Sequence, residues 1–193
     1  MFKQLFTISF LALITYCYSQ SSSLGQCSDR TNIKPVENFD FVRYVADGQR
    51  KYTVRIHNAV GDCQYMNLNL TSNVTANLHW ERKSLPSGTR VVRDGVVTWA
   101  PASGTRDGII SVKYPNVNNS LVYIILGIDY DEYSIGYRCV DLDASRIESI
   151  WVRSNNMNYT SQQAAVFNQI LSDNGLSDLA LTDVVQDPAR CSP

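Results

Sequence analysis

The chain has 193 residues, of which 44% are hydrophobic and 18% charged, and its formal net charge is −1. A chain of this length forms one domain, or at most a small pair of domains. Its hydrophobic fraction is that of a globular core, which excludes wholesale disorder. With 17 basic and 18 acidic residues the sequence has no electrostatic footprint for nucleic acid, so we expect no nucleic-acid partner.

The first 19 residues have the pattern of a targeting segment. Lys3 is followed by an apolar stretch ending near Tyr16, which is shorter than the roughly 20 residues that a transmembrane helix needs. Ser19, with Cys17 two positions before it, fits a cleavage site. We therefore predict a signal peptide over 1–19 and a single secreted, extracellular domain over 20–193, with an N-terminal anchor helix as the alternative. No later apolar run is long enough to span a membrane, so no integral membrane segment is expected.

Four cysteines remain once Cys17 is removed with the signal peptide: Cys27, Cys63, Cys139 and Cys191. An even number in an oxidising compartment predicts two disulfides, but four cysteines allow three pairings and the spacing does not choose among them. The absence of a C-x-x-C pair argues against a zinc or redox site, and we expect no metal.

Glycosylation sequons agree with export. The N-x-[ST] pattern without proline occurs four times, at Asn69, Asn73, Asn118 and Asn158. We expect glycans on some of these four asparagines.

From residue 49 to 153 the sequence consists of short β-branched and aromatic runs separated by turn residues, which is typical of an antiparallel sandwich or barrel. The eight candidate strands are 51–57, 63–70, 74–82, 89–101, 108–114, 121–130, 133–140 and 146–153. Asp94-Gly95 is a hairpin signal, but the strands on either side would be very short. We interpret it as a bulge or bend within one longer strand.

Alternation with period two gives the second and third candidate strands two distinct faces. The apolar faces carry Met66, Leu68 and Leu70, and then Val74, Ala76, Leu78 and Trp80. A glycan on Asn69 or Asn73, on the opposite faces, must lie in solvent, so the apolar sets are expected to point inward. The run 121–126 is apolar on both faces, which requires a covering element outside it.

A helix predicted over 160–174 supplies that cover. It contains no Gly or Pro and places Ala164, Phe167, Ile170 and Leu171 at helical spacing. Thr160 or Ser161 can cap its start, and Gly175 can end it. A short run at 181–185 suggests a ninth strand.

The residue patterns fit two architectures equally well. One is a closed barrel with room for a small ligand, and the other is a sandwich with a filled core.

The sequence resembles the lipocalin family. Within this family it is most similar to the group that contains apolipoprotein D, Lazarillo and the insect bilin-binding proteins. The matching motifs are 38–40 with Tyr44, 61–63, 127–134 followed by Cys139, 148–151, and 170–175 with Thr182, Asp183 and Cys191. The resemblance implies an all-β, eight-stranded, antiparallel up-and-down barrel with one C-terminal α-helix packed outside. It also implies the disulfides Cys27–Cys139 and Cys63–Cys191.

The resemblance further implies a ligand wall inside the barrel, formed by Leu68, Tyr123, Ile125 and Trp151, with Tyr133 as a further candidate. The alternation adds Met66 and Trp80 to this wall. Such an apolar and aromatic surface suits a small hydrophobic ligand. The expected function is that of a secreted protein that binds and transports a lipid, retinoid, sterol or bilin inside the barrel. No cofactor is expected beyond such a bound ligand or pigment, and no pattern identifies a cell-surface receptor.

One part of the family pattern is missing. Lipocalins carry a G-x-W motif whose tryptophan closes the barrel floor beneath an arginine, but the segment 46–50 has no tryptophan. The arginine is expected four residues after Trp151, where Asn155 stands, while Arg153 lies two residues earlier. This departure motivates an alternative function: an extracellular interaction or stress-protective protein with a reduced or collapsed cavity.

Catalysis has little support in the sequence. We find no G-x-S-x-G elbow, P-loop, G-x-G-x-x-G or H-E-x-x-H motif. His57 and His79 are the two histidines, and both are expected at the surface. The four remaining cysteines are expected in disulfides, so no thiol is left as a nucleophile. We expect a protein that is not an enzyme and has no catalytic residues.

Overall fold

The computed structural model describes residues 22–45, 49–58, 61–84 and 87–191; the predicted signal peptide lies outside the described residues. The elements in chain order are β1 (Ser23–Leu24), η2 (Cys27–Asp29), α2 (Phe41–Val45), β2 (Lys51–His57), β3 (Asp62–Ser72), β4 (Thr75–Lys83), β5 (Arg90–Trp99), β6 (Ile109–Lys113), β7 (Leu121–Asp129), β8 (Tyr133–Leu142), β9 (Ser145–Ser154), α3 (Ser161–Asp173), β10 (Thr182–Asp183) and α4 (Pro188–Cys191).

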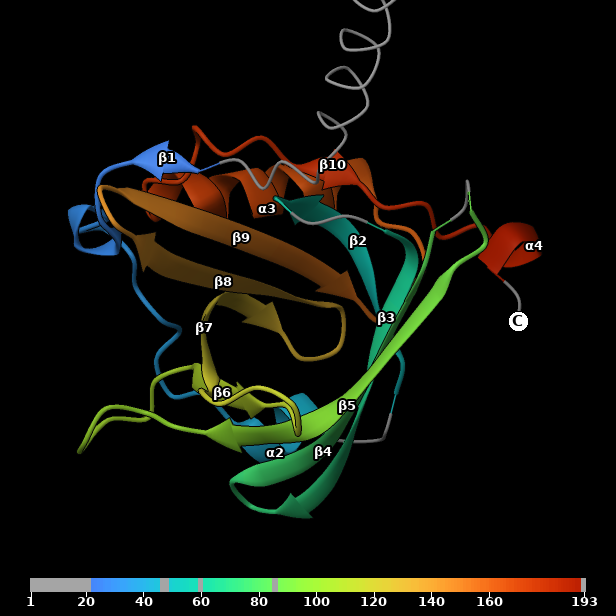
Figure 1. Ribbon diagram of the computed structural model, residues 1–193, viewed down its shortest axis with the longest axis horizontal. Coiled ribbons are helices and arrows are strands. Elements are labelled where there is room, and N and C mark those ends of the chain that lie inside the picture. The colour runs from blue at the N-terminus through green and yellow to red at the C-terminus, as the bar shows by residue number, and fades with distance from the viewer. Residues whose placement is uncertain (1–21, 46–48, 59–60, 85–86, 192–193) are drawn as a thin grey trace, which may run out of the picture.

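The eight strands β2 to β9 form a closed antiparallel barrel (Figure 1). Each strand pairs with the next along the chain, and β9 pairs back with β2 to complete the ring. The short strands β1 and β10 extend the sheet beside β9 and β2. The predicted barrel is confirmed, and the sandwich alternative is wrong.

Strand β5 runs without interruption through Asp94 and Gly95. His79 pairs with Asp94 and Leu78 with Gly95 across the β4–β5 ladder. A Cβ atom at position 95 would lie 2.7 Å from the backbone oxygen of Lys113, so a side chain does not fit there. The prediction of a single long strand in place of a hairpin is confirmed, and the glycine permits a close approach of two backbones.

The inward face predicted for β3 and β4 is correct in the body of the barrel. Met66, Leu68 and Leu78 are buried, but Leu70 is 43% and Val74 is 44% exposed. These last two side chains lie at the β3–β4 hairpin, beyond the rim of the barrel core. Alternation alone does not show where a strand leaves the core, so the prediction was wrong at both positions.

Helix α3 has the start, end and packing that its sequence predicts. The Thr160 side chain accepts a hydrogen bond from the backbone of Gln163, whose side chain accepts one from the backbone of Thr160. Gly175 follows the helix with φ +67°, a left-handed conformation that glycine adopts without strain. Phe167 and Leu171 are buried in one cluster with Leu126 of β7. The helix runs along the outside of the barrel beside β9 (Figure 1) and covers the second apolar face of β7.

One end of the barrel is covered by α2 and the residues before it. The Phe39 backbone donates a hydrogen bond to the Arg106 carbonyl in the β5–β6 turn, and the Asp40 backbone donates one to the Tyr130 hydroxyl in the β7–β8 turn. Alternate turns of an up-and-down barrel lie at the same end, so the turns after β2, β4, β6 and β8 surround the opposite, open end.

Phe39 and residues of α2 close the covered end. Phe39, Phe41, Tyr44 and Val45 are at most 2% exposed, and the rings of Phe39 and Tyr44 lie 5.3 Å apart. In the segment that lacks the G-x-W tryptophan, residues 46–48 lie outside the described part of the chain. The described residues therefore build the floor from the segment immediately before it.

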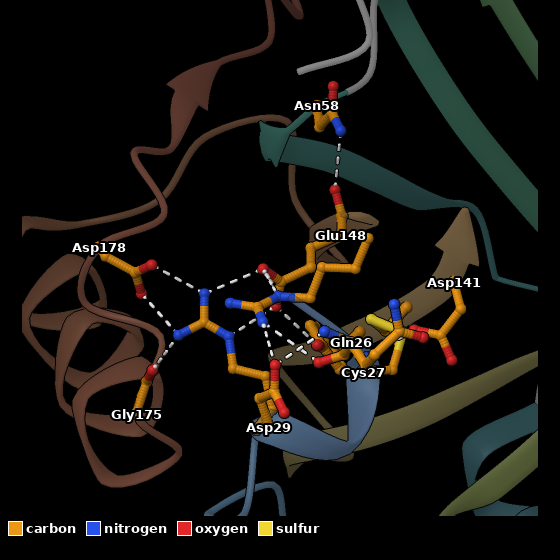
Figure 2. A network of polar contacts seen from close by, with 12 residues as sticks. Gln26, Cys27, Asp29, Asn58, Asp141, Glu148, Gly175 and Asp178 are labelled. Carbon is orange, nitrogen blue, oxygen red and sulfur yellow. Dashed lines mark hydrogen bonds and ion pairs between the residues drawn. A yellow bond between two sulfur atoms is a disulfide. The ribbon is translucent and has the colours of Figure 1, made fainter. Parts of the chain in front are cut away.

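Two disulfides and a buried polar network hold the chain ends against the barrel. The disulfides join Cys27 to Cys139 and Cys63 to Cys191, the pairing that the resemblance implied. In the network, the buried Glu148 carboxylate accepts hydrogen bonds at 2.8 Å from Arg30, Arg146 and the Tyr137 hydroxyl. Figure 2 shows Glu148 and Asp178 converging on this network from β9 and from the segment after α3.

Candidate ligand-binding site

The barrel encloses a cavity of about 600 Å³. Its walls are side chains of strands β3 to β9, and Tyr44 of α2 contributes from the covered end. Pockets of about 300 to 1,000 Å³ are the usual size for small-molecule sites. The barrel interior is therefore neither collapsed nor filled by its own side chains, which removes the premise of the alternative function.

Six of the seven residues predicted for the ligand wall line this cavity. They are Met66, Leu68, Trp80, Tyr123, Ile125 and Trp151. Tyr133 is placed elsewhere: its ring meets Phe167 of α3 edge-on at 5.1 Å, on the outside of the barrel. On β8 the inward positions are even-numbered, as Arg138 in the cavity wall shows. A neighbouring odd-numbered position faces the helix, which corrects the prediction for Tyr133.

The cavity changes in character along the barrel axis. Near the floor its wall is aliphatic, formed by Leu68, Val97, Ile110 and Ile125. Trp80, Tyr123 and Trp151 follow at mid-height, and the rings of Tyr123 and Trp151 lie 5.4 Å apart, edge to face. An elongated apolar molecule can contact this lower and middle wall while one end faces the open rim.

No family model matches the chain. The chain is 25% identical to apolipoprotein D of Cavia porcellus over 190 residues, which cover 97% of the chain and 96% of the relative. It is 24% identical to apolipoprotein D of Oryctolagus cuniculus over 181 residues, covering 91% and 92%. Among solved structures it is similar to insecticyanin of the tobacco hornworm Manduca sexta, with a TM-score of 0.74, 20% identity, and 90% and 93% coverage.

The chain folds as a lipocalin. Lobster apocrustacyanin A1 shows the same architecture, with a TM-score of 0.69, 16% identity, and coverage of 87% of this chain and 92% of the lobster protein. The resemblance to the apolipoprotein D and bilin-binding group is thereby confirmed. Lipocalins are binding proteins and are generally not enzymes.

The upper part of this lipocalin cavity carries arginines that sequence reasoning did not assign to it. Arg82, Arg93 and Arg138 line the wall toward the open end. The guanidinium carbon of Arg93 lies 5.8 Å from the centre of the Trp80 ring and 5.9 Å from that of Tyr114. Alternation offered a signal for the first of these arginines, because Arg82 shares the inward face of β4 with Trp80.

Arg153 takes a different place from the floor arginine of the family pattern. It lines the cavity, is only 9% exposed, and its guanidinium carbon lies 5.9 Å from the centre of the Trp151 ring. Because Trp151 and Arg153 are two residues apart on β9, both side chains point inward. The side chain therefore belongs to the ligand wall rather than to the outer side of the floor.

Tyr114 and Tyr123 are two of the three tyrosines that line the cavity, and they give its wall neutral hydroxyl groups. Burial raises the pKa of Tyr114 to about 12 and also raises the pKa of Tyr123. Both side chains are therefore protonated at neutral pH and can donate a hydrogen bond to a ligand oxygen.

The remaining predicted residues lie outside the cavity. Asn69, Asn73, Asn118 and Asn158 are all exposed, as glycan acceptors must be. His79 forms a 2.7 Å contact with Asp94, and His57 forms a 2.8 Å contact with the Ala180 carbonyl.

Among the described residues, no three His, Cys, Asp or Glu side chains cluster as a metal site would require. In the same part of the chain, no helix combines the length and the apolar character of a membrane span.

Proposed function

We propose that the chain is a secreted lipocalin, a single domain over 20–193, that binds and transports a small hydrophobic ligand in its barrel. The observation that carries the proposal is the cavity of about 600 Å³, closed at the floor by α2 and walled by aliphatic and aromatic side chains. Met66, Leu68, Trp80, Tyr123, Ile125 and Trp151 are the proposed contact residues. We propose no catalytic role.

Burial of the ligand body is the expected source of affinity. Removing about 300 Å² of apolar ligand surface from water contributes roughly 7 kcal/mol, at about 25 cal/mol per Å². The loss of translational and rotational freedom opposes this contribution. Because Trp80 and Trp151 stand at mid-height, both rings contact a ligand body that reaches the aliphatic lower wall.

Secretion is supported by the two disulfides and by the exposed sequons. Disulfides persist in oxidising compartments, and both bonds here tie chain ends to the barrel. Each bond closes a loop of more than 100 residues. In the chain-entropy model such a loop contributes about 4–5 kcal/mol of stability before any strain.

Tryptophan fluorescence tests ligand binding directly. The chain has three tryptophans; Trp80 and Trp151 line the cavity, whereas Trp99 packs against Phe39 with its Nε1 donating to the Asp107 carbonyl. The mature protein is titrated with retinol, retinoic acid, oleic acid and biliverdin. We expect saturable quenching that persists in Trp99→Phe and decreases in Trp151→Phe.

Failure of all four molecules to give a saturable signal would overturn the proposed function. Quenching that depends on Trp99 rather than on Trp80 and Trp151 would place binding outside the barrel and would also overturn it.

A further inference from the structure

The cavity wall contains four arginines and, among the described residues, no aspartate or glutamate. The arginines are Arg82, Arg93, Arg138 and Arg153. Elsewhere on the molecule, Arg30, Arg90 and Arg146 each form an ion pair with a glutamate at 2.6–2.8 Å. Among the described residues that line the cavity, the formally charged side chains are therefore all positive.

Arg153 is the most deeply placed of the four. It is 9% exposed, and its Nε atom has no hydrogen-bond partner within the described residues. Its Nη1 atom lies 3.3 Å from the position that a Cβ of Gly136 would occupy. The guanidinium therefore lies close to β8 at a position where the strand has no side chain. Gly136 pairs with Trp151 on β9, so this part of the guanidinium lies at the level of Trp151 in the barrel wall.

A buried guanidinium in this setting lacks its usual compensation. A guanidinium stays protonated in proteins and presents five N–H donors in a planar fork. Burying such a group without an anionic partner is unfavourable, and a carboxylate is the partner whose two oxygens match the fork. The Trp151 ring face compensates this charge only in part.

The arginines of the cavity wall create a positive potential at the Tyr123 hydroxyl. Burial raises the pKa of the Tyr123 hydroxyl. The positive charges that oppose this rise come from Arg138, Arg153 and Arg93. Three arginines therefore act on one hydroxyl inside the cavity, and a ligand oxyanion near that hydroxyl is attracted by all three.

We propose that the ligand is an apolar molecule that carries a carboxylate, and that Arg153 binds this carboxylate inside the barrel. This inference rests on the proposed function and narrows its ligand class. The apolar body lies against the aliphatic and aromatic wall, and the Tyr123 hydroxyl is positioned to donate to the same carboxylate. Arg93 and Arg138 supply attraction from the upper wall, where solvent screens charge more strongly.

Matched pairs of probes with the same apolar body test this assignment. The pairs are oleic acid and oleyl alcohol, retinoic acid and retinol, and biliverdin and its dimethyl ester. A charge-assisted hydrogen bond in a buried site is worth about 10- to 100-fold in affinity. We expect each acid to bind more tightly than its neutral partner by this factor, and the pair with the largest ratio identifies the body that fits the cavity.

Variants assign the preference to one side chain. Arg153→Gln is expected to reduce the acid-to-neutral ratio to near one, chiefly by weakening the binding of the acid. Arg153→Lys keeps the charge without the fork and should retain part of the preference. Arg106→Gln is the control, because it removes an equal charge from an exposed arginine that lies over Trp99 outside the cavity.

Thermal unfolding of the ligand-free protein gives a second readout. Arg153→Gln removes a buried charge that forms no ion pair with a carboxylate of the described residues, so its Tm should equal or exceed that of the wild type. A fall in Tm together with loss of all binding would show that Arg153 is needed for folding, and would overturn its assignment as a ligand contact.

The outcomes separate the two proposals. Equal binding of acid and neutral probes by the wild type, or an unchanged ratio in Arg153→Gln, overturns the carboxylate assignment and leaves the proposed function intact. If no member of any pair binds, both proposals fail.

Discussion

Tyr123 of β7 and Trp151 of β9 meet edge to face inside the barrel, with ring centres 5.4 Å apart. These two strands are not neighbours, because β8 lies between them. Gly136 of β8 pairs with Ile125 on one side and Trp151 on the other, and its lack of a side chain leaves the inner surface of β8 open at that level. The aromatic part of the ligand wall therefore depends on a glycine from the strand between the two rings.

Truncating Trp151 should impair binding more than stability. Trp151 borders the cavity, so Trp151→Ala removes ligand contacts without emptying a packed core, and we expect at least a tenfold loss of affinity for the best probe. Phe167 is fully buried between α3 and the barrel. Phe167→Ala should destabilise the fold by about 3–5 kcal/mol. Titrations at a temperature where both variants are folded check the contrast; equal affinities for the two variants would contradict it.

A side chain at position 136 should disturb the site. A Cβ atom there would lie 3.3 Å from Nη1 of Arg153, so Gly136→Ala requires a small shift of a flexible group. Gly136→Val adds further atoms toward the same guanidinium and toward the Tyr123–Trp151 pair. We expect near-normal binding for Gly136→Ala and at least a fivefold loss for Gly136→Val, with both variants retaining the β-sheet circular dichroism spectrum. Stronger binding by Gly136→Val would contradict the described packing.

Acid should destabilise the fold through the Glu148 network. Burial favours the protonated carboxyl, but the hydrogen bonds from its three partners outweigh burial and lower the pKa of Glu148. Hydrogen bonds from Arg30 likewise lower the pKa of Asp178. A carboxyl with a lowered pKa stabilises the fold above its unfolded value, about 3.9 for Asp and 4.3 for Glu. That stability is lost as the pH falls through the folded pKa.

Denaturant unfolding as a function of pH measures this contribution. Glu148→Gln leaves Arg30 and Arg146 without their shared carboxylate, so we expect a loss of about 3–5 kcal/mol at neutral pH. The difference from wild type should shrink below about pH 4. Glu37→Gln, at an exposed position, is the matched control and should change stability by less than about 0.5 kcal/mol. A constant difference across the acid range would exclude Glu148 as the titrating group.

The disulfide pairing has its own test. Mass spectrometry of unreduced proteolytic digests should find peptides that join Cys27 to Cys139 and Cys63 to Cys191. Replacing either pair by alanine should lower stability by up to about 4–5 kcal/mol. A peptide that joins Cys27 to Cys63 would rule out this arrangement.

The sequence was sufficient to predict the strands, the outer helix and most of the cavity wall. Period-two alternation identifies which side chains share a face, and Met66, Leu68 and Trp80 followed from it. The same pattern does not show where a strand leaves the core, which is why Leu70 and Val74 were assigned inward although they are exposed at a hairpin.

The floor and the charged wall could not be predicted in the same way. Helix α2 has five residues, too few for a helical period to be visible in the sequence. The predicted wall contained no arginine, because charged side chains are rarely buried. Only the three-dimensional structure shows that Arg138 and Arg153, fifteen residues apart in the sequence, face one cavity.

The most direct measurement of the central claim is native mass spectrometry of the protein, purified without detergent. The account predicts a discrete added mass of a small molecule on the wild-type chain, retained under gentle ionisation and reduced or absent in Trp151→Ala. The mass of the bare protein alone, together with no uptake of any offered lipid, retinoid or bilin, would contradict it.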